Sequence, residues 1–68
     1  MAALNARTAA RIRGLMAEQK KSTAGLAGHL GISRQAAAKK VQGHTGLSVD
    51  DLEQIAGWLG VESKDLIP

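Results

Sequence analysis

The chain has 68 residues, with nine lysines and arginines, six aspartates and glutamates, a single tryptophan as its only large aromatic residue, and no cysteine. A chain this short forms one domain that buries only about 60% of the surface of its unfolded form, which argues against a large catalytic pocket. The lack of cysteine excludes disulfides and thiolate metal sites, as is typical of a reducing cytosol. No apolar run approaches the roughly 18 residues of a membrane span. We therefore expect one soluble, cytoplasmic domain over residues 1–68.

Basic and acidic residues are unevenly distributed along the chain. Residues 1–43 contain eight basic residues and one acidic residue, a net charge of +7, whereas residues 44–68 contain one basic and five acidic residues, a net charge of −4. A basic surface attracts polyanions, and an acidic one discourages non-specific adsorption. The first part of the chain is thus either the binding surface for a polyanion or an ordinary solvated face.

The first predicted element is an amphipathic helix over roughly residues 6–19, with Asn5 as its N-cap. Leu15 and Met16 lie three and four residues after Ile12, which places all three on one face. The arginines beside this face leave membrane-surface binding as an alternative, but the apolar stripe is better used in a protein core.

Two short helices separated by a glycine follow, over residues 22–43. Ser22 is expected to cap the first, which ends at Gly31 because glycine readily adopts the left-handed conformation that terminates helices. The second starts after Ser33 and spans residues 34–41. Two short helices joined in this way have the outline of a helix-turn-helix.

The last predicted helix begins at Ser48, with Asp51 three residues later in an Asp variant of the capping box. The residues expected to be buried by this helix are Leu52, Ile55, Ala56 and Leu59. The residues expected to close the end of the core are Val61, Leu66 and Ile67, with Ser63 capping a last turn. Because alternating strand patterns are absent, the predicted fold is all-α, a compact bundle of about five short helices containing the helix-turn-helix.

Several short apolar and glycine-containing segments are distributed over nearly the full chain. They are Ile12-Arg13-Gly14-Leu15-Met16, Leu26-Ala27, Gly31-Ile32-Ser33-Arg34, Leu52, Ile55-Ala56 and Leu59-Gly60-Val61. In these motifs the chain resembles the lambda-repressor-like family, the phage repressor and Cro type of DNA-binding domain. It departs from the family pattern at Ala37, where a larger branched residue is common, and at Lys40, where an apolar residue is common and Val41 takes its place. A slight rotation of the third helix would follow.

The resemblance implies that the third helix enters the DNA major groove while the second lies across the backbone. Arg34 can bond two acceptors of guanine, and Gln35 two positions of adenine. Lys39 can reach guanine acceptors one turn further on, and Ala36 can touch a thymine methyl. The alternative is that these residues form only a solvated helix surface.

Phosphates are expected to meet the N-terminus of the second helix, where free amides and the hydroxyls of Ser22 and Thr23 are available. The remaining candidate phosphate contacts are Lys21, Ser33, Lys40, His44 and Thr45. Such contacts set affinity and its salt dependence without reading sequence. Each has a structural alternative, since a serine can be only a cap and a lysine only solvated.

Metal binding and catalysis find no support in the sequence. His29 and His44 have no second ligand at a recognised spacing, and no cysteine accompanies them. The serines that precede the predicted helices have a capping role that requires no nucleophile. We therefore expect no metal, no cofactor, no small-molecule substrate and no enzymatic activity.

Family members commonly bind two-fold related half-sites as dimers through their C-terminal region. The resemblance therefore implies a weak or DNA-assisted homodimer, with Trp58, Leu66 and Ile67 as the candidate interface. Trp58 lies beside the apolar stripe of its helix, so it belongs either to the edge of the core or to a partner contact.

The sequence thus predicts a sequence-specific regulator of transcription that binds double-stranded DNA, a phage or prophage Cro-like repressor acting on DNA in a bacterial cell or a phage-infected host. The alternative is an antitoxin-like or other partner-binding module. Binding of a specific duplex by the purified protein alone separates the two.

Overall fold

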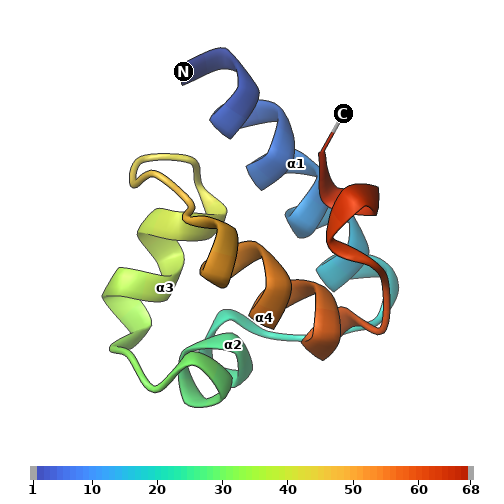
Figure 1. The fold of residues 1–68 in the computed structure, drawn as a ribbon. Coiled ribbons are helices and arrows are strands. Elements are labelled where there is room, and N and C mark those ends of the chain that lie inside the picture. The colour runs from blue at the N-terminus through green and yellow to red at the C-terminus, as the bar shows by residue number, and fades with distance from the viewer. Residues whose placement is uncertain (1, 68) are drawn as a thin grey trace.

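The computed structural model describes the backbone of residues 2–67 and the side chains of residues 6–67. The helices are α1 (Ala2–Glu18), α2 (Thr23–Leu30), α3 (Arg34–Val41), α4 (Val49–Leu59) and the single 3-10 turn η1 (Ser63–Leu66). In Figure 1, α4 runs through the middle of the bundle, with α1 and η1 on one side and α2 and α3 on the other. The described residues contain no strand, so the all-α fold class is confirmed. The expected fifth helix is only one 3-10 turn, so the described residues form four α-helices rather than five.

Helix α1 begins earlier than the sequence pattern indicated. It starts at Ala2, so the backbone of Asn5 lies within the helix and does not form its N-cap. The side chain of Asn5 lies outside the described residues. Alanine has the highest helix propensity of all residues, and the alanines before and after Asn5 extend the helix through the expected cap. As a result the first turns of α1 project beyond the rest of the bundle (Figure 1).

The other helix ends follow the local signals. Ser22, Ser33 and Ser48 are the N-caps of α2, α3 and α4, and each hydroxyl accepts a hydrogen bond from the backbone N–H three residues later, at 3.0–3.1 Å. Gly31 and Gly60 end α2 and α4 in the left-handed conformation, with φ of 69° and 72°. Gly31 and Ser33 therefore define the turn between α2 and α3.

One hydrophobic core joins all five elements. Its buried residues are Ile12, Met16, Leu26, Ala27, Ala37, Val41, Ile55, Ala56, Leu59 and Leu66. Leu52 is only partly buried at the edge of this core. Of the three residues expected to close the core, Leu66 is fully buried, Val61 packs against the core partly buried, and Ile67 is 48% exposed. Ile67 therefore does not close the core. Ser63 is the first residue of η1, and Glu62 stands at the cap position instead.

Two arginines of α1, and Gln19 directly after it, donate hydrogen bonds to the C-terminal ends of three other elements. The three hydrogen bonds, each 2.7 Å long, run from Arg11 Nε to the carbonyl of Asp65, from Arg13 Nη1 to that of Val41, and from Gln19 Nε2 to that of Leu59. Carbonyl groups at a helix C-terminus lack partners within the helix and carry partial negative charge, which cations stabilise. Arg11 and Arg13, which belong to the basic residues 1–43, therefore form hydrogen bonds within the protein.

Candidate nucleic-acid interface

Helices α2 and α3 pack against each other across the turn at residues 31–33. Leu26 and Ala27 of α2 are buried, and the small side chain of Ala27 allows close packing of the second helix. The backbone N–H of Ile32 donates to the carbonyl of Ala27 at 3.0 Å, which ties the turn to the end of α2. Helices α2 and α3, joined by this turn, thus occupy the segment 22–43 in which the helix-turn-helix was expected.

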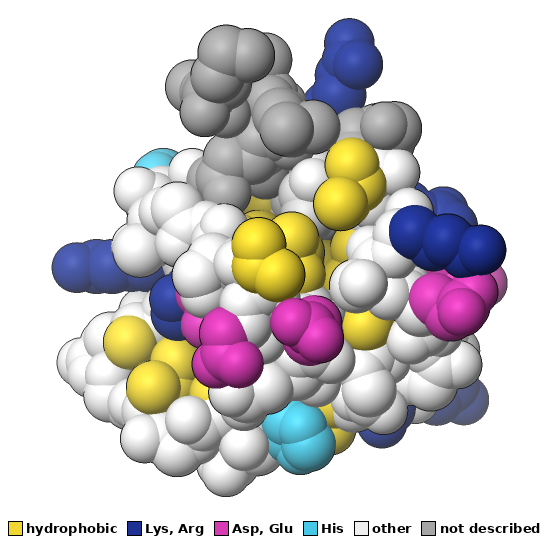
Figure 2. Space-filling view, in the orientation of Figure 1, with side chains coloured by type: hydrophobic (Ala, Val, Ile, Leu, Met, Phe, Trp, Pro, Cys, Tyr) yellow, Lys and Arg dark blue, Asp and Glu magenta, His cyan; other side chains and the backbone are white. Residues whose placement is uncertain are grey.

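Helix α3 has one face in the core and one face open to solvent. Ala37 is fully buried and Val41 is 5% exposed. Arg34, Gln35 and Lys39 are exposed, and their side chains form no hydrogen bond or ion pair with any other part of residues 6–67. Figure 2 shows a Lys or Arg side chain extending from the side of the molecule where α3 lies. Three of the four expected base-reading side chains are therefore exposed, and the fourth, Ala36, is partly buried.

The loop after α3 wraps around the end of that helix. The backbone N–H groups of His44 and Thr45 donate to the carbonyl of Lys39, at 2.9 and 3.4 Å. Both residues are exposed. The loop thereby places these two expected phosphate contacts next to α3.

The N-terminus of α2 presents a second set of the expected contacts. Ser22 is exposed and Thr23 is partly buried. The hydroxyl of Ser22 accepts the capping bond, as does that of Ser33 at the start of α3, and each hydroxyl hydrogen remains for another acceptor. The capping role and a phosphate-binding role are therefore compatible in both serines.

Lys21 is held by Trp58 of α4. Its Nζ donates to the carbonyl of Trp58 at 2.9 Å and lies 4.7 Å from the centroid of the indole ring. The indole also lies against α2, with the His29 ring centroid 6.2 Å away, and a Cβ at Gly25 would lie 3.4 Å from Trp58 Cζ2. Trp58 is therefore a partly buried residue at the edge of the core, and its ring lies against α2 and Lys21.

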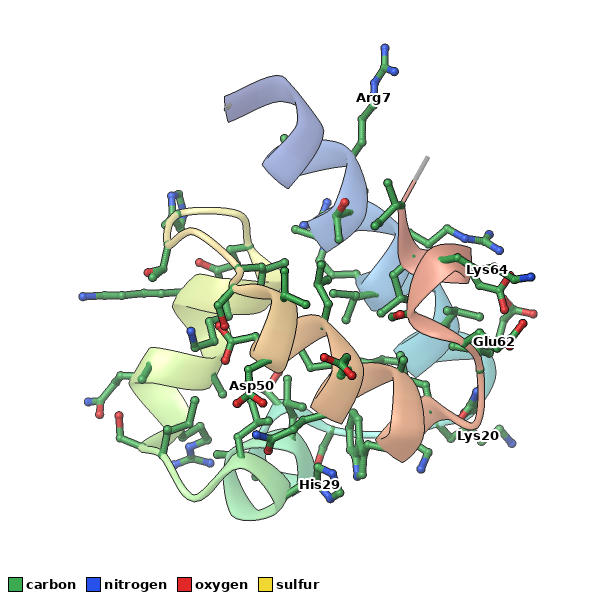
Figure 3. All side chains as sticks on the ribbon, in the orientation of Figure 1. Arg7, Lys20, His29, Asp50, Glu62 and Lys64 are labelled. Atoms are coloured by element: carbon green, nitrogen blue, oxygen red, sulfur yellow. The ribbon has the colours of Figure 1, made fainter. Side chains whose placement is uncertain are left out.

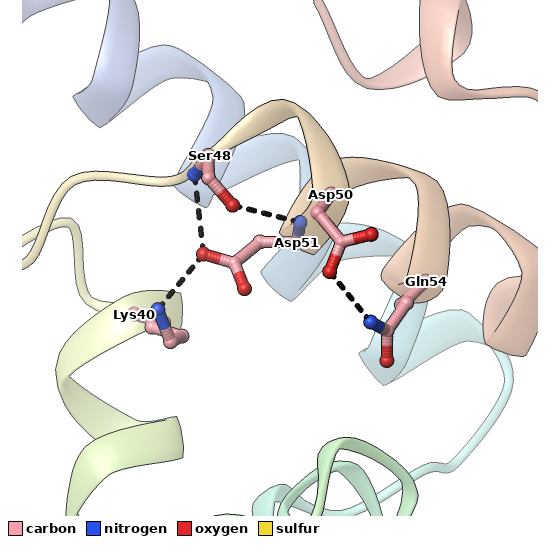
Figure 4. A network of polar contacts seen from close by, with 5 residues as sticks. All are labelled: Lys40, Ser48, Asp50, Asp51 and Gln54. Carbon is pink, nitrogen blue, oxygen red and sulfur yellow. Dashed lines mark hydrogen bonds and ion pairs between the residues drawn. The ribbon is translucent and has the colours of Figure 1, made fainter.

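Lys40 of α3 forms an ion pair with Asp51 of α4. Its Nζ lies 2.9 Å from Asp51 Oδ2, and the two side chains are only 17% and 21% exposed. The same oxygen accepts the backbone N–H of Ser48 at 3.1 Å, which completes the capping box of α4 (Figure 4). Burial raises the pKa of Asp51, but the hydrogen bonds from Lys40 and Ser48 and the charge of Lys40 outweigh it and leave that pKa below its ordinary value of 3.8.

The Lys40–Asp51 pair was not found from the sequence. The sequence shows two separate features. Lys40 stands where the family commonly has an apolar residue, and Asp51 stands at the third position of a predicted helix. Nothing in the local pattern connected the two.

Half of the basic side chains of residues 1–43 have partners within the protein. They are Arg11, Arg13, Lys21 and Lys40. Lys20 and the pair Glu62 and Lys64 lie on the side of the molecule away from α3, and Arg7 extends outward from α1 (Figure 3). Only Lys40 is neutralised by a carboxylate, whereas the other three side chains with partners donate to neutral carbonyls and keep their charge. Near α3, Arg34 and Lys39 are the described basic residues whose side chains have no partner within the protein.

Leu66 was expected in the dimer interface, and the structure shows that it does not belong there. Because it is fully buried in the core of one chain, it has no surface to offer a second chain. Ile67 remains exposed at 48%, and Val49 at the start of α4 is 73% exposed.

Among residues 6–67, no three His, Asp or Glu side chains are grouped so as to hold a metal ion. No helix within residues 2–67 is long and apolar enough to cross a membrane.

The model of the Cro/C1-type HTH DNA-binding domain matches residues 11–68. The chain belongs to this family. The match covers both helices of the helix-turn-helix and the residues that hold them, so this Cro/C1-type domain is a DNA-binding domain in which α3 is the second helix of the motif. No curated protein matches the chain significantly.

Solved structures share the fold of this Cro/C1-type domain. The clp gene regulator ClgR from Corynebacterium glutamicum has a TM-score of 0.86 at 21% identity, over 93% of this chain and 67% of its own. The restriction-modification controller protein C.AhdI from Aeromonas hydrophila has a TM-score of 0.85 at 23% identity, over 96% and 98%. FeII HppE has a TM-score of 0.85 at 27% identity, over 96% of this chain but only 34% of its own. The fold thus occurs both as nearly a whole chain and as a minor part of a longer one.

Proposed function

We propose that the chain is a sequence-specific regulator of transcription, a phage or prophage Cro-like repressor that acts through DNA binding rather than catalysis. The observation that carries this proposal is the outward face of α3, where Arg34, Gln35 and Lys39 are exposed and have no partner within the described part of the protein. Arginine and lysine pair with guanine acceptors and glutamine with adenine, so this face has the chemistry of direct readout in the major groove.

The proposed base contacts are Arg34, Gln35, Ala36 and Lys39, and the proposed phosphate contacts are Lys21, Ser22, Thr23, Ser33, His44 and Thr45. Lys40 was also expected among the latter. The ammonium of Lys40 is bound by the carboxylate of Asp51, so Lys40 is left out of the proposed set. The ammonium of Lys21 donates one of its three N–H groups to the carbonyl of Trp58, so Lys21 stays in the proposed set. Helix N-termini and loop donors then carry most of the backbone contacts.

A weak or DNA-assisted homodimer is also proposed, with Ile67 and the exposed part of Trp58 in its interface. Ile67 is a large apolar side chain at the surface, which favours contact with another apolar surface. The proposal of a dimer rests on this exposed residue and on the family resemblance. It does not rest on the two regulators that share the fold.

The proposed role of Arg34 is tested by titrating a bound duplex with Arg34→Ala and with Lys64→Ala as the matched control. Lys64 is exposed and lies away from α3. Loss of a bidentate contact to guanine weakens binding by about 1–3 kcal/mol and relaxes the preference at that base pair. Equal affinity and equal preference in Arg34→Ala and Lys64→Ala would remove Arg34 from the interface.

An antitoxin-like or other partner-binding module is the second candidate. Val49, 73% exposed at the start of α4, is the observation in its favour, since it offers an apolar contact for a protein partner. This candidate predicts that the purified chain binds no specific duplex by itself. Specific binding by the chain alone would count against it.

A further inference from the structure

We propose that the Lys40–Asp51 ion pair sets the rotation of α3 about its own axis, so that both are positioning residues for base reading rather than DNA contacts. This inference rests on the proposed function of α3. It assigns different roles to two adjacent lysines, because Lys39 is exposed without a partner whereas Lys40 is 17% exposed and bound to Asp51.

Helix α3 needs such a constraint because its own core contacts are small. Its two buried residues are Ala37 and Val41, and their neighbours Ala36 and Ala38 are partly buried alanines. A methyl group makes few of the dispersion contacts that a leucine side chain makes, so it offers less resistance to rotation of the helix. The apolar packing of α3 alone therefore defines its rotation weakly.

Small rotations matter at the tips of long side chains. The end of an arginine lies roughly 8 Å from the helix axis, so a rotation of about 10° displaces it by about 1.4 Å. A hydrogen bond to a base edge forms only within a range of donor–acceptor distances that is about half an ångström wide. A rotation of this size would therefore break a bidentate contact made by Arg34.

The ion pair can resist this rotation because its acceptor is fixed. Asp51 Oδ2 accepts the backbone N–H of Ser48 at 3.1 Å, so the carboxylate is part of the capping box of α4. Helix α4 is in turn anchored in the core by Ile55 and Leu59, which are fully or nearly fully buried. Lys40 thus connects α3 to a rigid point on another helix.

A second attachment follows at the next residue. Arg13 of α1 donates to the carbonyl of Val41 at 2.7 Å. Helix α3 is therefore tied at consecutive residues to α4 and to α1. Turning Lys40 toward DNA would break the first of these ties and leave the partly buried Asp51 carboxylate without its cation, which is unfavourable.

The test compares Lys40→Met, Asp51→Asn and the double variant on the duplex that wild-type protein selects and on versions of it with single base pairs changed. Methionine keeps the aliphatic length of lysine, and asparagine keeps an oxygen for the cap. Discrimination at the base pairs read by α3 should fall about 10-fold in each single variant. It should fall no further in the double variant, because the two residues act as one pair. Lys40→Arg, which keeps the charge, should retain the wild-type preference, and Lys64→Met should do so as well.

Salt dependence separates positioning from phosphate binding. Loss of a phosphate contact lowers the slope of log K against log salt concentration by about one. We expect that slope to stay at its wild-type value in Lys40→Met and Asp51→Asn. A reduced slope in Lys40→Met together with an unchanged base preference in Asp51→Asn would overturn the proposal and make Lys40 a phosphate contact. Loss of stability without any loss of base preference would also overturn it.

A measurement without DNA keeps this inference separate from the proposed function. Amide hydrogen exchange of residues 38–41 in the free protein should be about 10-fold faster in Lys40→Met and in Asp51→Asn, and unchanged in Lys64→Met. Should wild-type protein bind no specific duplex, the proposed function would fail, and the exchange rates would still report whether the pair holds α3. Identical exchange in all variants would show that it does not.

Discussion

Arg13 of α1 donates a hydrogen bond of 2.7 Å from Nη1 to the carbonyl of Val41, the last residue of α3, which lies 28 positions away in the sequence. The bond joins a cationic group to the negative end of the helix that carries the proposed base contacts. It makes Arg13 a structural residue, although the sequence counts it among the basic residues of the DNA-binding part.

We predict that Arg13→Met lowers the free energy of unfolding by about 1–2 kcal/mol, because a partly buried charge-assisted hydrogen bond to a helix end is lost. Urea denaturation of the wild-type and variant proteins measures this change. Arg7→Met is the matched control, since Arg7 extends from α1 into solvent (Figure 3). Equal losses in the two variants would mean that the bond to Val41 contributes nothing.

Two leucines that differ in burial, Leu26 and Leu52, should differ in their contributions to stability. Leu26 is fully buried, so Leu26→Ala should cost about 2–5 kcal/mol, a large part of the stability of so small a domain. Leu52 is only partly buried, and Leu52→Ala should cost about 1 kcal/mol. Thermal melts followed by circular dichroism compare them. A fully cooperative melt at the wild-type temperature in Leu26→Ala would contradict the core described here.

Two glycines of the helix-turn-helix should respond oppositely to alanine. Gly31 ends α2 with φ of 69°, a conformation that alanine adopts only at a cost, so Gly31→Ala should destabilise the protein by about 1 kcal/mol. Gly28 lies inside α2 with nothing within 4 Å of an added Cβ, so Gly28→Ala should stabilise it by about 0.5–1 kcal/mol. Denaturant midpoints test both. Effects of the same sign would contradict the conformations assigned to these positions.

The ion pair of Lys40 should appear in the pH dependence of stability. The pKa of Asp51 in the folded protein lies below its ordinary value of 3.8, so its ionised form stabilises the fold above that value, and this contribution is lost as the pH falls through the folded pKa. Wild-type protein should therefore be more stable than Asp51→Asn at neutral pH, and the difference should shrink in strong acid. A difference that is constant from neutral pH down to strong acid would show that the carboxylate gains nothing from its partners.

Local sequence signals predicted much of this fold. The serines at positions 22, 33 and 48 cap the helices that follow them, and the glycines at 31 and 60 end helices, because caps depend on residues only a few positions apart. The same local reasoning failed at Asn5. A residue that can cap a helix does not stop one when alanines on both sides favour its continuation.

Contacts between distant residues could not be predicted in this way. Leu66 and Ile67 are both apolar, and a single 3-10 turn has no repeat that shows which of them faces the core. The partners of Lys21 and Lys40 are Trp58 and Asp51, on another helix. The outward face of α3 was predictable because its spacing is local, whereas the attachments that orient α3 depend on tertiary packing.

If α3 of this chain reads DNA sequence, the purified protein should select a defined site from a random pool of duplexes. We expect enrichment of one site, arranged as an inverted repeat if the chain binds as a dimer, and relaxation of one position of that site when the selection is repeated with Arg34→Ala. A pool that shows no enrichment with wild-type protein, or the same enriched site with Arg34→Ala, would contradict this expectation.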